Sequence, residues 1–459
     1  MGTYNRSDLD AAIKAYDVRG VVGEGIDPDL VGDIGAAFGY IMRGEGATRA
    51  VVGYDMRESS PELAESFARG AAAQGLNVTL LGMTSTDELY YASGALECPG
   101  AMFTASHNPA KYNGIKMCRS LARPVGEETG LGKIKDLLVD GIPEYNGEAG
   151  AIDTKDVLAD YAEFLHSLVD VRSGRRLKVA VDAGNGMGGL TVPAVLGEDF
   201  DIADLYFELD GNFPNHEANP LEPANLVDLQ KFTVETGSDI GIAFDGDADR
   251  CFVVDELGNP VSPSAICALV ASRYLQKFPG ATIIHNLITS HVVPEMIAEN
   301  GGTAVRTRVG HSFIKAQMAQ SGAVFGGEHS AHYYFSEFFN ADSGMLAAMH
   351  VLAALAEQDK PLSEFMAEYT RYEASGEINS RLGSAQEQKA KQAEIETAFA
   401  ERTASSDWMD GLTIELKDSK AWFNVRASNT EPLLRLNVEA PTRAEVDALV
   451  DEVLGIIRG

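Results

Sequence analysis

The sequence predicts an α/β fold with three similar α/β domains, built on mixed sheets, plus a C-terminal α+β domain around a central cleft. Three observations support this prediction. The chain has 459 residues, which is too long for one hydrophobic core. Continuous apolar runs recur along it, and helix-length segments such as 61–74 and 344–355 separate them. This alternation is typical of mixed or parallel sheets covered on both faces by helices.

Three stretches of the chain resemble one another, and each contains three apolar runs. The first runs are strands at Arg49–Gly53, Leu177–Val181 and Ala281–Ile284. The second runs begin at Asn77, Asp204 and Thr303, and the third begin at Gly100, Asp239 and Gly322. Each third run ends in a loop of reactive side chains. Because ligands gather at strand ends in such sheets, we expect these loops to face one site.

The repeat ends near Tyr369, where the pattern changes. A polar helical stretch at Ser384–Arg402 precedes two strand-like runs, 411–416 and 421–427. This order predicts a separate α+β domain. The predicted domains are therefore 1–150, 151–254, 255–368 and 369–459.

Composition excludes several classes of partner. The formal net charge of −31 repels nucleic acids and anionic lipids, so we expect neither a nucleic acid nor a membrane partner. No apolar stretch approaches the roughly 20 residues of a membrane span. The cysteines lack C-x-x-C spacing and the start of the chain lacks a signal-peptide pattern, which together favour a cytoplasmic protein. The sequence leaves the oligomeric state open.

The most specific metal signal follows the apolar strand 240–244. Asp245, Asp247 and Asp249 occupy alternate positions there, with small residues between them. Three hard carboxylates in a compact loop suit Mg²⁺ and leave coordination positions for a phosphate oxygen. A solvated acidic turn is the simpler alternative.

An EF-hand would also begin with this aspartate pattern. Glu256 even falls at the twelfth position of such a loop. However, Arg250 occupies the sixth position, where the sharp turn needs glycine, and both flanks have the pattern of strands. We therefore reject the EF-hand.

A haloacid-dehalogenase-type phosphatase is a second alternative for the same loop. Asp245 would be its nucleophile and Asp247 its acid/base. That family usually has Thr or Val after its D-x-D, whereas this chain has Asp249, and the alternative leaves a second reactive loop unexplained. It remains the alternative among phosphoryl-transfer enzymes.

The second reactive loop is Thr104–Pro109, followed by Tyr112–Lys116. Ser106, on a polar turn at a strand end, is placed to act as a nucleophile. We do not expect His107 to be its base, because adjacent residues in an extended turn point apart. The Gly-x-Ser-x-Gly elbow of Ser-His-Asp hydrolases is absent. By itself, Ser106 could equally be a capping hydroxyl.

The ordered motifs TASHNP with YNGIK, DGDADR, GEHS and RASNTEP resemble the α-D-phosphohexomutase superfamily, which includes phosphomannomutases and phosphoglucomutases. The resemblance runs from Tyr16 to Pro432, and it implies that the four predicted domains carry, in order, a phosphoserine loop, a magnesium loop, a sugar-recognition loop and a phosphate-binding loop. It implies that Ser106 carries a phosphoryl group. It also implies that Asp245, Asp247 and Asp249 bind Mg²⁺ together with that phosphoserine.

The resemblance gives roles to further residues. Arg19 would stabilise charge on the transferring phosphoryl, Lys116 would shuttle protons or balance charge, and His311 would be an acid/base candidate. Glu328 and Ser330 would hold two neighbouring sugar hydroxyls. Arg426, Ser428, Asn429 and Thr430 would surround the phosphate that is not reacting. The other expected substrate contacts are Tyr16, His107, Arg250, Arg308, Gly310 and His332.

The implied reaction interconverts hexose 6-phosphate and hexose 1-phosphate, with mannose or glucose as the hexose. It proceeds through phosphoserine and a bisphosphorylated sugar, and a glucose 1,6-bisphosphate-type activator primes Ser106. Alternatives are a phosphoglucosamine mutase, a D-x-D sugar phosphatase and a non-catalytic sugar-phosphate sensor. Two positions depart from the family: Ala331 stands where many relatives have glycine, and Ile288 where some have lysine. We therefore expect the phosphate contact that this lysine would make to be either missing or supplied by Arg308.

Overall fold

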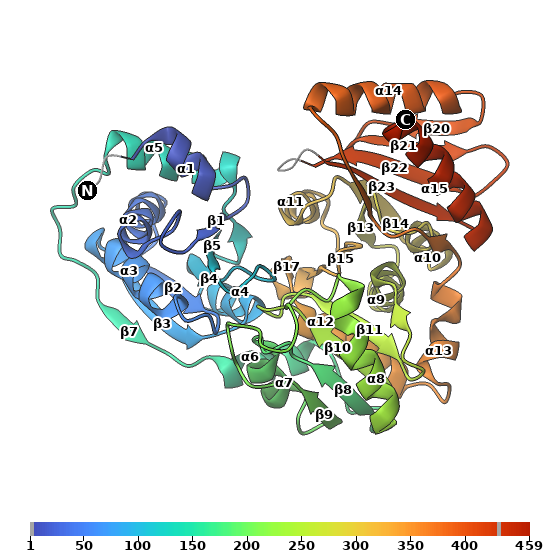
Figure 1. Ribbon diagram of the computed structural model, residues 1–459. Coiled ribbons are helices and arrows are strands. Elements are labelled where there is room, and N and C mark those ends of the chain that lie inside the picture. Colours follow the sequence, from blue (N-terminus) through green and yellow to red (C-terminus); the bar gives the residue numbers. More distant parts are fainter. Residues whose placement is uncertain (1–3, 429–432) are drawn as a thin grey trace.

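The computed structural model describes residues 4–428 and 433–459, without the side chains of residues 311 and 312. Its strands form four sheets, one for each part of an arc-shaped molecule (Figure 1). The first part, in blue, and the C-terminal part, in red, lie at the two ends of the arc. The second and third parts lie between them. The predicted α/β class with a C-terminal α+β domain is confirmed.

The first three sheets share one topology, which confirms the threefold repeat. In each, the strand of the first apolar run lies between the strands of the third and second runs and is parallel to both. The next strand along the chain then pairs antiparallel with the third. The three sheets are therefore mixed, and the loop after the third strand lies at the same edge in each.

The first sheet has the order β1-β5-β4-β2-β3-β7, with β6 on β5. Its strands are β1 (Val18–Val21), β2 (Arg49–Tyr54), β3 (Asn77–Met83), β4 (Gly100–Phe103), β5 (Tyr112–Arg119), β6 (Arg123–Pro124) and β7 (Ile152–Thr154). The main helices around it are α2 (Pro28–Gly44), α3 (Ser60–Ala73) and α4 (Thr86–Ala95). Apolar side chains of α2, α3 and the sheet form a core of their own.

The second sheet has the order β12-β11-β10-β8-β9 and the third β14-β13-β15-β16-β17. The second consists of β8 (Lys178–Asp182), β9 (Asp201–Leu205), β10 (Ile240–Phe244), β11 (Cys251–Asp255) and β12 (Pro260–Val261). The third consists of β13 (Thr282–Asn286), β14 (Thr303–Thr307), β15 (Phe325–Gly327), β16 (Tyr333–Phe335) and β17 (Ala341–Asp342). Strands β7 and β12 lie past residues 150 and 254, so the first two sheets extend beyond the predicted limits. The predicted apolar run that begins at Asp204 also differs from the structure, because β9 ends at Leu205 and most of the run follows the strand.

One apolar core joins the second and third domains and also includes side chains of the first, such as Val51 and Leu89. It continues across both sheets and includes helix α12 (Gly344–Ala356), every residue of which is buried. Helix α12 packs against α9 (Pro263–Lys277) and β11. Because buried apolar area is the main source of cohesion, these two domains behave as one block.

The C-terminal domain has a six-stranded antiparallel sheet and a separate core. Its strands are β18 (Glu373–Ala374), β19 (Ile378–Arg381), β20 (Thr403–Asp407), β21 (Leu412–Leu416), β22 (Trp422–Ala427) and β23 (Leu433–Ala440). Helices α14 (Ala385–Phe399) and α15 (Arg443–Arg458) pack against each other and against the sheet. The predicted helix at 384–402 thus corresponds to α14.

Polar contacts dominate the boundary between the third and fourth domains. Glu295 of α10 (Val292–Glu299) accepts hydrogen bonds from Lys420 Nζ at 2.6 Å and from Tyr372 OH at 2.6 Å. Arg306 of β14 forms an ion pair with Asp407 of β20. These contacts contrast with the continuous apolar core that joins the second and third domains.

Two predictions from composition can be compared with the structure. Among the helices in residues 4–428 and 433–459, none is long and apolar enough to cross a membrane. The four cysteines are all buried and unpaired: Cys98, Cys118, Cys251 and Cys267.

Candidate active site

Ser106 lies where the first domain meets the second. It follows β4 in a left-handed backbone conformation, with φ of 48°, and is only 6% exposed. Its Oγ donates a hydrogen bond to Asp245 Oδ2 at 2.8 Å. A Cβ at Gly246 would lie 2.4 Å from the carbonyl oxygen of Ser106, so the two loops can approach only with glycine there. The serine loop and the aspartate loop are therefore in direct contact.

The expectation that His107 points away from Ser106 is wrong. The left-handed conformation of Ser106 turns the two side chains together, and Ser106 Oγ lies 3.2 Å from His107 Nδ1. However, Arg250 Nη2 donates to the same nitrogen at 2.7 Å. Burial, helped by the positive charge of Arg250, lowers the pKa of His107 to about 2. His107 is thus a neutral hydrogen-bond acceptor, and Arg250 occupies its lone pair.

The three aspartates form a compact buried cluster. Oxygens of Asp245, Asp247 and Asp249 all lie within 4.8 Å of one another. In the described part of the chain, Asp247 Oδ1 and Asp249 Oδ1 are buried and accept no hydrogen bond. Oxygen ligands that converge with free lone pairs suit Mg²⁺, so the donor set fits the predicted metal.

Two cations balance the charge of this cluster. Lys116 Nζ lies 2.7 Å from Asp247 Oδ2 and 2.5 Å from Asp249 Oδ2. Arg250 Nε donates to Asp245 Oδ2 at 3.0 Å. With all three carboxylates ionised, the two cations leave a net charge of about −1, which still attracts a divalent cation.

The same contacts give the neighbouring carboxylates different acidities. Burial raises the pKa of Asp245 to about 7, although Arg250 opposes the rise. Burial would also raise the pKa of Asp247, but the ammonium group of Lys116 outweighs it and holds that pKa below its usual range. Asp247 and Asp249 in turn overcome the effect of burial on Lys116 and raise its pKa well above the ordinary value. Lys116 is therefore charged at neutral pH.

Arg19 on β1 also contacts the serine loop. Its Nη1 donates to the Ala105 carbonyl at 2.9 Å and to Asn108 Oδ1 at 2.5 Å, and its Nη2 donates to Asp17 Oδ2 at 2.5 Å. The side chain is about one-fifth exposed. Arg19 is thus held by the loop that carries Ser106.

Tyr16 and Arg308 meet on Phe313, although they belong to the first and third domains. The Tyr16 and Phe313 rings make an edge-to-face contact with centroids 6.2 Å apart. The Arg308 guanidinium lies 4.8 Å from the centroid of the Phe313 ring. The expected substrate contacts from these two domains are therefore close to one another.

The sugar-recognition loop follows β15 and converges on Glu328. This carboxylate is 2% exposed and accepts hydrogen bonds from Gly310 N at 3.1 Å, Ser330 Oγ at 3.1 Å and Tyr334 OH at 3.3 Å. Glu328, Ser330 and Gly310 therefore lie together. Ala331 has φ of 68°, a left-handed conformation that costs an L-residue about 1–2 kcal/mol relative to glycine. This strain is the physical consequence of the departure noted in the sequence.

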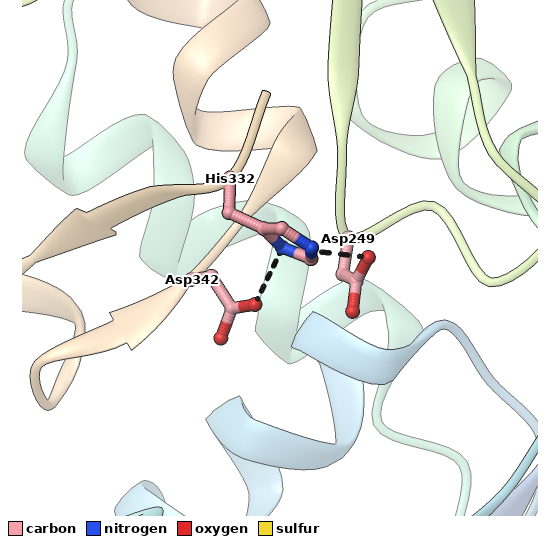
Figure 2. A group of neighbouring side chains, drawn as sticks. All are labelled: Asp249, His332 and Asp342. Carbon is pink, nitrogen blue, oxygen red and sulfur yellow. Dashed lines mark hydrogen bonds and ion pairs between the residues drawn. The ribbon is translucent and has the colours of Figure 1, made fainter. Parts of the chain in front are cut away.

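His332 connects the sugar-recognition loop to the aspartate loop (Figure 2). Its Nδ1 lies 3.0 Å from Asp342 Oδ2 and 3.9 Å from Asp249 Oδ1. Burial disfavours a charged ring, but Asp249 and Asp342 outweigh it and raise the pKa of His332. Lys315 Nζ is 2.7 Å from Asp342. His332 and Lys315 both contact Asp342, so these side chains and Asp249 form one buried polar network.

The phosphate cradle is described only in part. Arg426 is the last residue but one of β22, and Ser428 follows the strand. Asn429 and Thr430, like the side chain of His311, lie outside the described residues. Arg435 of β23 pairs directly with Arg426 across the sheet. Glu377 lies between them, 3.4 Å from Arg426 Nη2 and 3.6 Å from Arg435 Nε. Sequence reasoning missed Arg435, although a cation inside an apolar strand beside the RASNTEP motif is a usable signal.

Other buried polar residues around the site were also missed. Thr86, at the start of α4, donates to Asp247 Oδ2 at 2.5 Å. Its neighbour Asp87 accepts hydrogen bonds from Tyr161 OH at 2.7 Å and Ser343 Oγ at 2.6 Å, which come from the second and third domains. Burial raises the pKa of Asp87 to about 6. Arg57, just after β2, is 1% exposed and contacts the serine loop.

Comparison with known proteins covers nearly the whole chain. Models of phosphoglucomutase/phosphomannomutase match as alpha/beta/alpha domain I at residues 10–139, domain II at 159–258, domain III at 262–372 and the C-terminal domain at 377–456. A phosphomannomutase of Salmonella montevideo is 38% identical and covers 93% of this chain and 94% of its own length. A phosphoglucomutase of Neisseria gonorrhoeae is 36% identical, with coverage of 97% and 96%. A solved phosphoglucomutase/phosphomannomutase family protein of Burkholderia thailandensis superimposes with a TM-score of 0.88 at 30% identity, with coverage of 99% and 97%.

Proposed function

The chain belongs to the phosphoglucomutase/phosphomannomutase family of the α-D-phosphohexomutase superfamily and is an intramolecular phosphotransferase, and we propose that Ser106 carries the phosphoryl group. The enzyme interconverts a hexose 6-phosphate and a hexose 1-phosphate. The observation that carries the assignment of Ser106 is its 2.8 Å hydrogen bond to Asp245. That contact joins a hydroxyl at one strand end to a carboxylate cluster at another.

We propose two phosphoryl transfers. In the first, the free hydroxyl oxygen of the sugar phosphate loses its proton and bonds to the phosphorus on Ser106 as the bond to Ser106 Oγ breaks. The resulting bisphosphorylated sugar then turns over within the site. In the second, Ser106 Oγ gives up a proton and bonds to the phosphorus of the other phosphoryl group as the bond from that phosphorus to its sugar oxygen breaks. The freed sugar oxygen takes up a proton, which leaves the isomeric monophosphate and phosphorylated Ser106. A glucose 1,6-bisphosphate-type activator would load Ser106 initially.

The charged side chains around Ser106 support the transfer electrostatically. When bound at Asp245, Asp247 and Asp249, Mg²⁺ would supply positive charge to the phosphoryl oxygens. Lys116 remains protonated beside these carboxylates and would neutralise another part of the developing charge. Arg19 would hold the loop and face the transferring group. His311 remains our candidate for moving the sugar proton.

Recognition would come from the third and fourth domains. Glu328 and Ser330 lie 3.1 Å apart and would bind adjacent sugar hydroxyls. Mannose and glucose differ at the 2-hydroxyl, which these residues would not contact, so both sugars fit the proposal. Tyr16, His107, Arg250, Arg308, Gly310 and His332 would complete the substrate contacts.

The C-terminal domain would hold the second phosphate. Arg426, Ser428, Asn429 and Thr430 offer donors for the group that is not reacting, in either orientation of the bisphosphate. We propose that this domain closes over the substrate and excludes water that would hydrolyse phosphoserine. Small-angle scattering with and without sugar phosphate tests the closure, and an unchanged radius of gyration would contradict it.

The assignment of Ser106 is tested by labelling. Incubation with glucose 1,6-bisphosphate should add one phosphoryl group to the protein, and peptide mass spectrometry should place it on Ser106. Ser106→Ala should take up none, whereas Ser120→Ala, at a serine in the turn after β5, should be labelled like the wild type. Full mutase activity of Ser106→Ala would refute the proposal.

The remaining alternatives predict different products. A phosphatase built on Asp245 would release inorganic phosphate without a bisphosphate activator. A non-catalytic sensor would show no turnover at all. Comparison of turnover on mannose 1-phosphate, glucose 1-phosphate and glucosamine 1-phosphate would identify the sugar and distinguish a phosphoglucosamine mutase.

A further inference from the structure

Arg57 makes an unusually complete set of contacts with the loop that carries Ser106. Its Nη2 donates to the carbonyl oxygens of Ser106 at 2.9 Å and Asn108 at 2.7 Å. Its Nη1 donates to the carbonyl oxygens of Pro109 at 3.0 Å and Tyr112 at 3.1 Å. Four backbone carbonyls of one loop therefore point to a single guanidinium group.

The fifth N–H of Arg57 fixes the group in place. Its Nε donates to Asp55 Oδ2 at 3.1 Å, and Asp55 Oδ1 accepts from Ser60 Oγ at 2.6 Å. The ring of Phe213, from the second domain, lies 5.1 Å from the guanidinium carbon. A guanidinium has five N–H groups, so each one has an acceptor. The side chain is buried and rigidly held.

The loop needs such an anchor because its geometry is unfavourable by itself. Ser106 has a left-handed φ of 48°, which serine adopts rarely. Its N–H is bonded to Thr104 Oγ1 at 2.8 Å. With the carbonyl bonded to Arg57 as well, both peptide groups that flank the Ser106 Cα have fixed orientations. The direction of Oγ toward Asp245 follows from them.

We propose that Arg57 is the positioning residue for Ser106. Its guanidinium binds carbonyls at Ser106 and beyond it and holds Oγ in line for phosphoryl transfer. This inference rests on the proposed role of Ser106. Arg57 does not touch the sugar in this role, so its loss should affect the transfer rate and leave substrate affinity nearly unchanged.

Arg57→Lys separates geometry from charge. Lysine keeps the positive charge beside Asp55 but has only three donors, so at least one loop carbonyl loses its partner. A misplacement of about 1 Å can cost about 100-fold in rate. We expect kcat to fall at least about tenfold, with KM for the hexose 1-phosphate within about threefold of the wild type. The rate of Ser106 labelling by glucose 1,6-bisphosphate should fall in parallel.

Val52→Ala is the matched control. Val52 is buried in β2, two positions before the end of the strand, so its truncation destabilises the same domain without removing a loop hydrogen bond. At equal loss of Tm, the control should keep its kcat. An unchanged kcat in Arg57→Lys, or an equal loss in Val52→Ala, would overturn the inference.

A second variant covers the case in which Arg57→Lys does not fold. Asp55→Asn keeps all four carbonyl bonds possible but weakens the anchor at Nε, and we expect kcat to fall several-fold with KM unchanged. An unchanged kcat in Asp55→Asn would then overturn the proposal. Failure of the proposed role of Ser106 differs from failure of the Arg57 proposal. If Ser106 does not carry the phosphoryl group, the wild-type protein itself would not be labelled on Ser106.

Discussion

Lys116→Met should destabilise the metal-free protein, and Mg²⁺ should recover most of the loss. Lys116 forms ion pairs with Asp247 and Asp249 at 2.7 and 2.5 Å. Loss of one partner of a buried ion pair costs about 3–5 kcal/mol. Because the Lys116 side chain is 18% exposed, water compensates in part and we expect about 3 kcal/mol. For a unit of about 150–250 residues this corresponds to a decrease in Tm of about 6–12 °C.

Added Mg²⁺ should act more strongly on the variant than on the wild type. In the wild type, Lys116 competes with a cation for the same carboxylates. In Lys116→Met the cluster gains about one net negative charge, so the bound ion relieves more repulsion. Saturation at about 100 times Kd stabilises a folded protein by about 2.7 kcal/mol, which is close to the expected loss.

The assay is thermal unfolding of both proteins in EDTA and in excess MgCl₂. Lys315→Met is the matched control, because Lys315 forms a comparably buried ion pair with Asp342, at 2.7 Å, but lies outside the aspartate loop. The Tm of Lys315→Met should decrease by a similar amount, and Mg²⁺ should not restore it. The reasoning is refuted if Lys116→Met is as stable as the wild type in EDTA, or if Mg²⁺ shifts both proteins equally.

Three further predictions concern other parts of the site. Ser106→Ala should abolish labelling and rapid turnover while calorimetry still detects sugar-phosphate binding; loss of that binding would contradict a purely catalytic role. Glu328→Gln should lower kcat/KM about 10–100-fold with Tm nearly unchanged, because a carboxylate that binds sugar hydroxyls becomes a weaker acceptor; wild-type kinetics would remove Glu328 from sugar recognition. The pKa of Asp87 in the folded state is raised from 3.8 to about 6. Its contribution to the free energy of unfolding is therefore fully present below about pH 4. This contribution is lost as the pH rises to about 6, which lowers the free energy of unfolding by about 3 kcal/mol. The stability of the wild type relative to Asp87→Asn should therefore decrease between pH 4 and 7, and a constant difference would show that Asp87 does not titrate there.

The strands and reactive loops were predictable because their signals are local. An apolar run such as 240–244 must be buried, and the polar residues that follow it must lie at a sheet edge. The threefold repeat then placed Ser106, Asp245 and Glu328 at equivalent edges. The structure confirms these strands, and it places Ser106 Oγ 2.8 Å from Asp245.

The contacts between domains were not predictable from local patterns. Asp87 meets Tyr161 and Ser343 across 74 and 256 residues of sequence, and only the packing of three domains decides that they touch. The expectation for His107 failed for a related reason. It assumed an extended backbone, whereas Ser106 has a φ of 48°, and one of the groups bonded to its backbone is the side chain of Arg57, 49 residues away.

The joint between the third and fourth domains has a mechanical consequence. It consists largely of ion pairs at partly solvated side chains, such as Glu295 with Lys420 and Arg306 with Asp407. Dissolved salt shortens the reach of such attractions to about 8 Å at physiological ionic strength and further as concentration rises. The stiffness of this joint is thus set by the surrounding solution as well as by the sequence. The contact between the second and third domains rests instead on buried apolar side chains, whose packing does not depend on ionic screening.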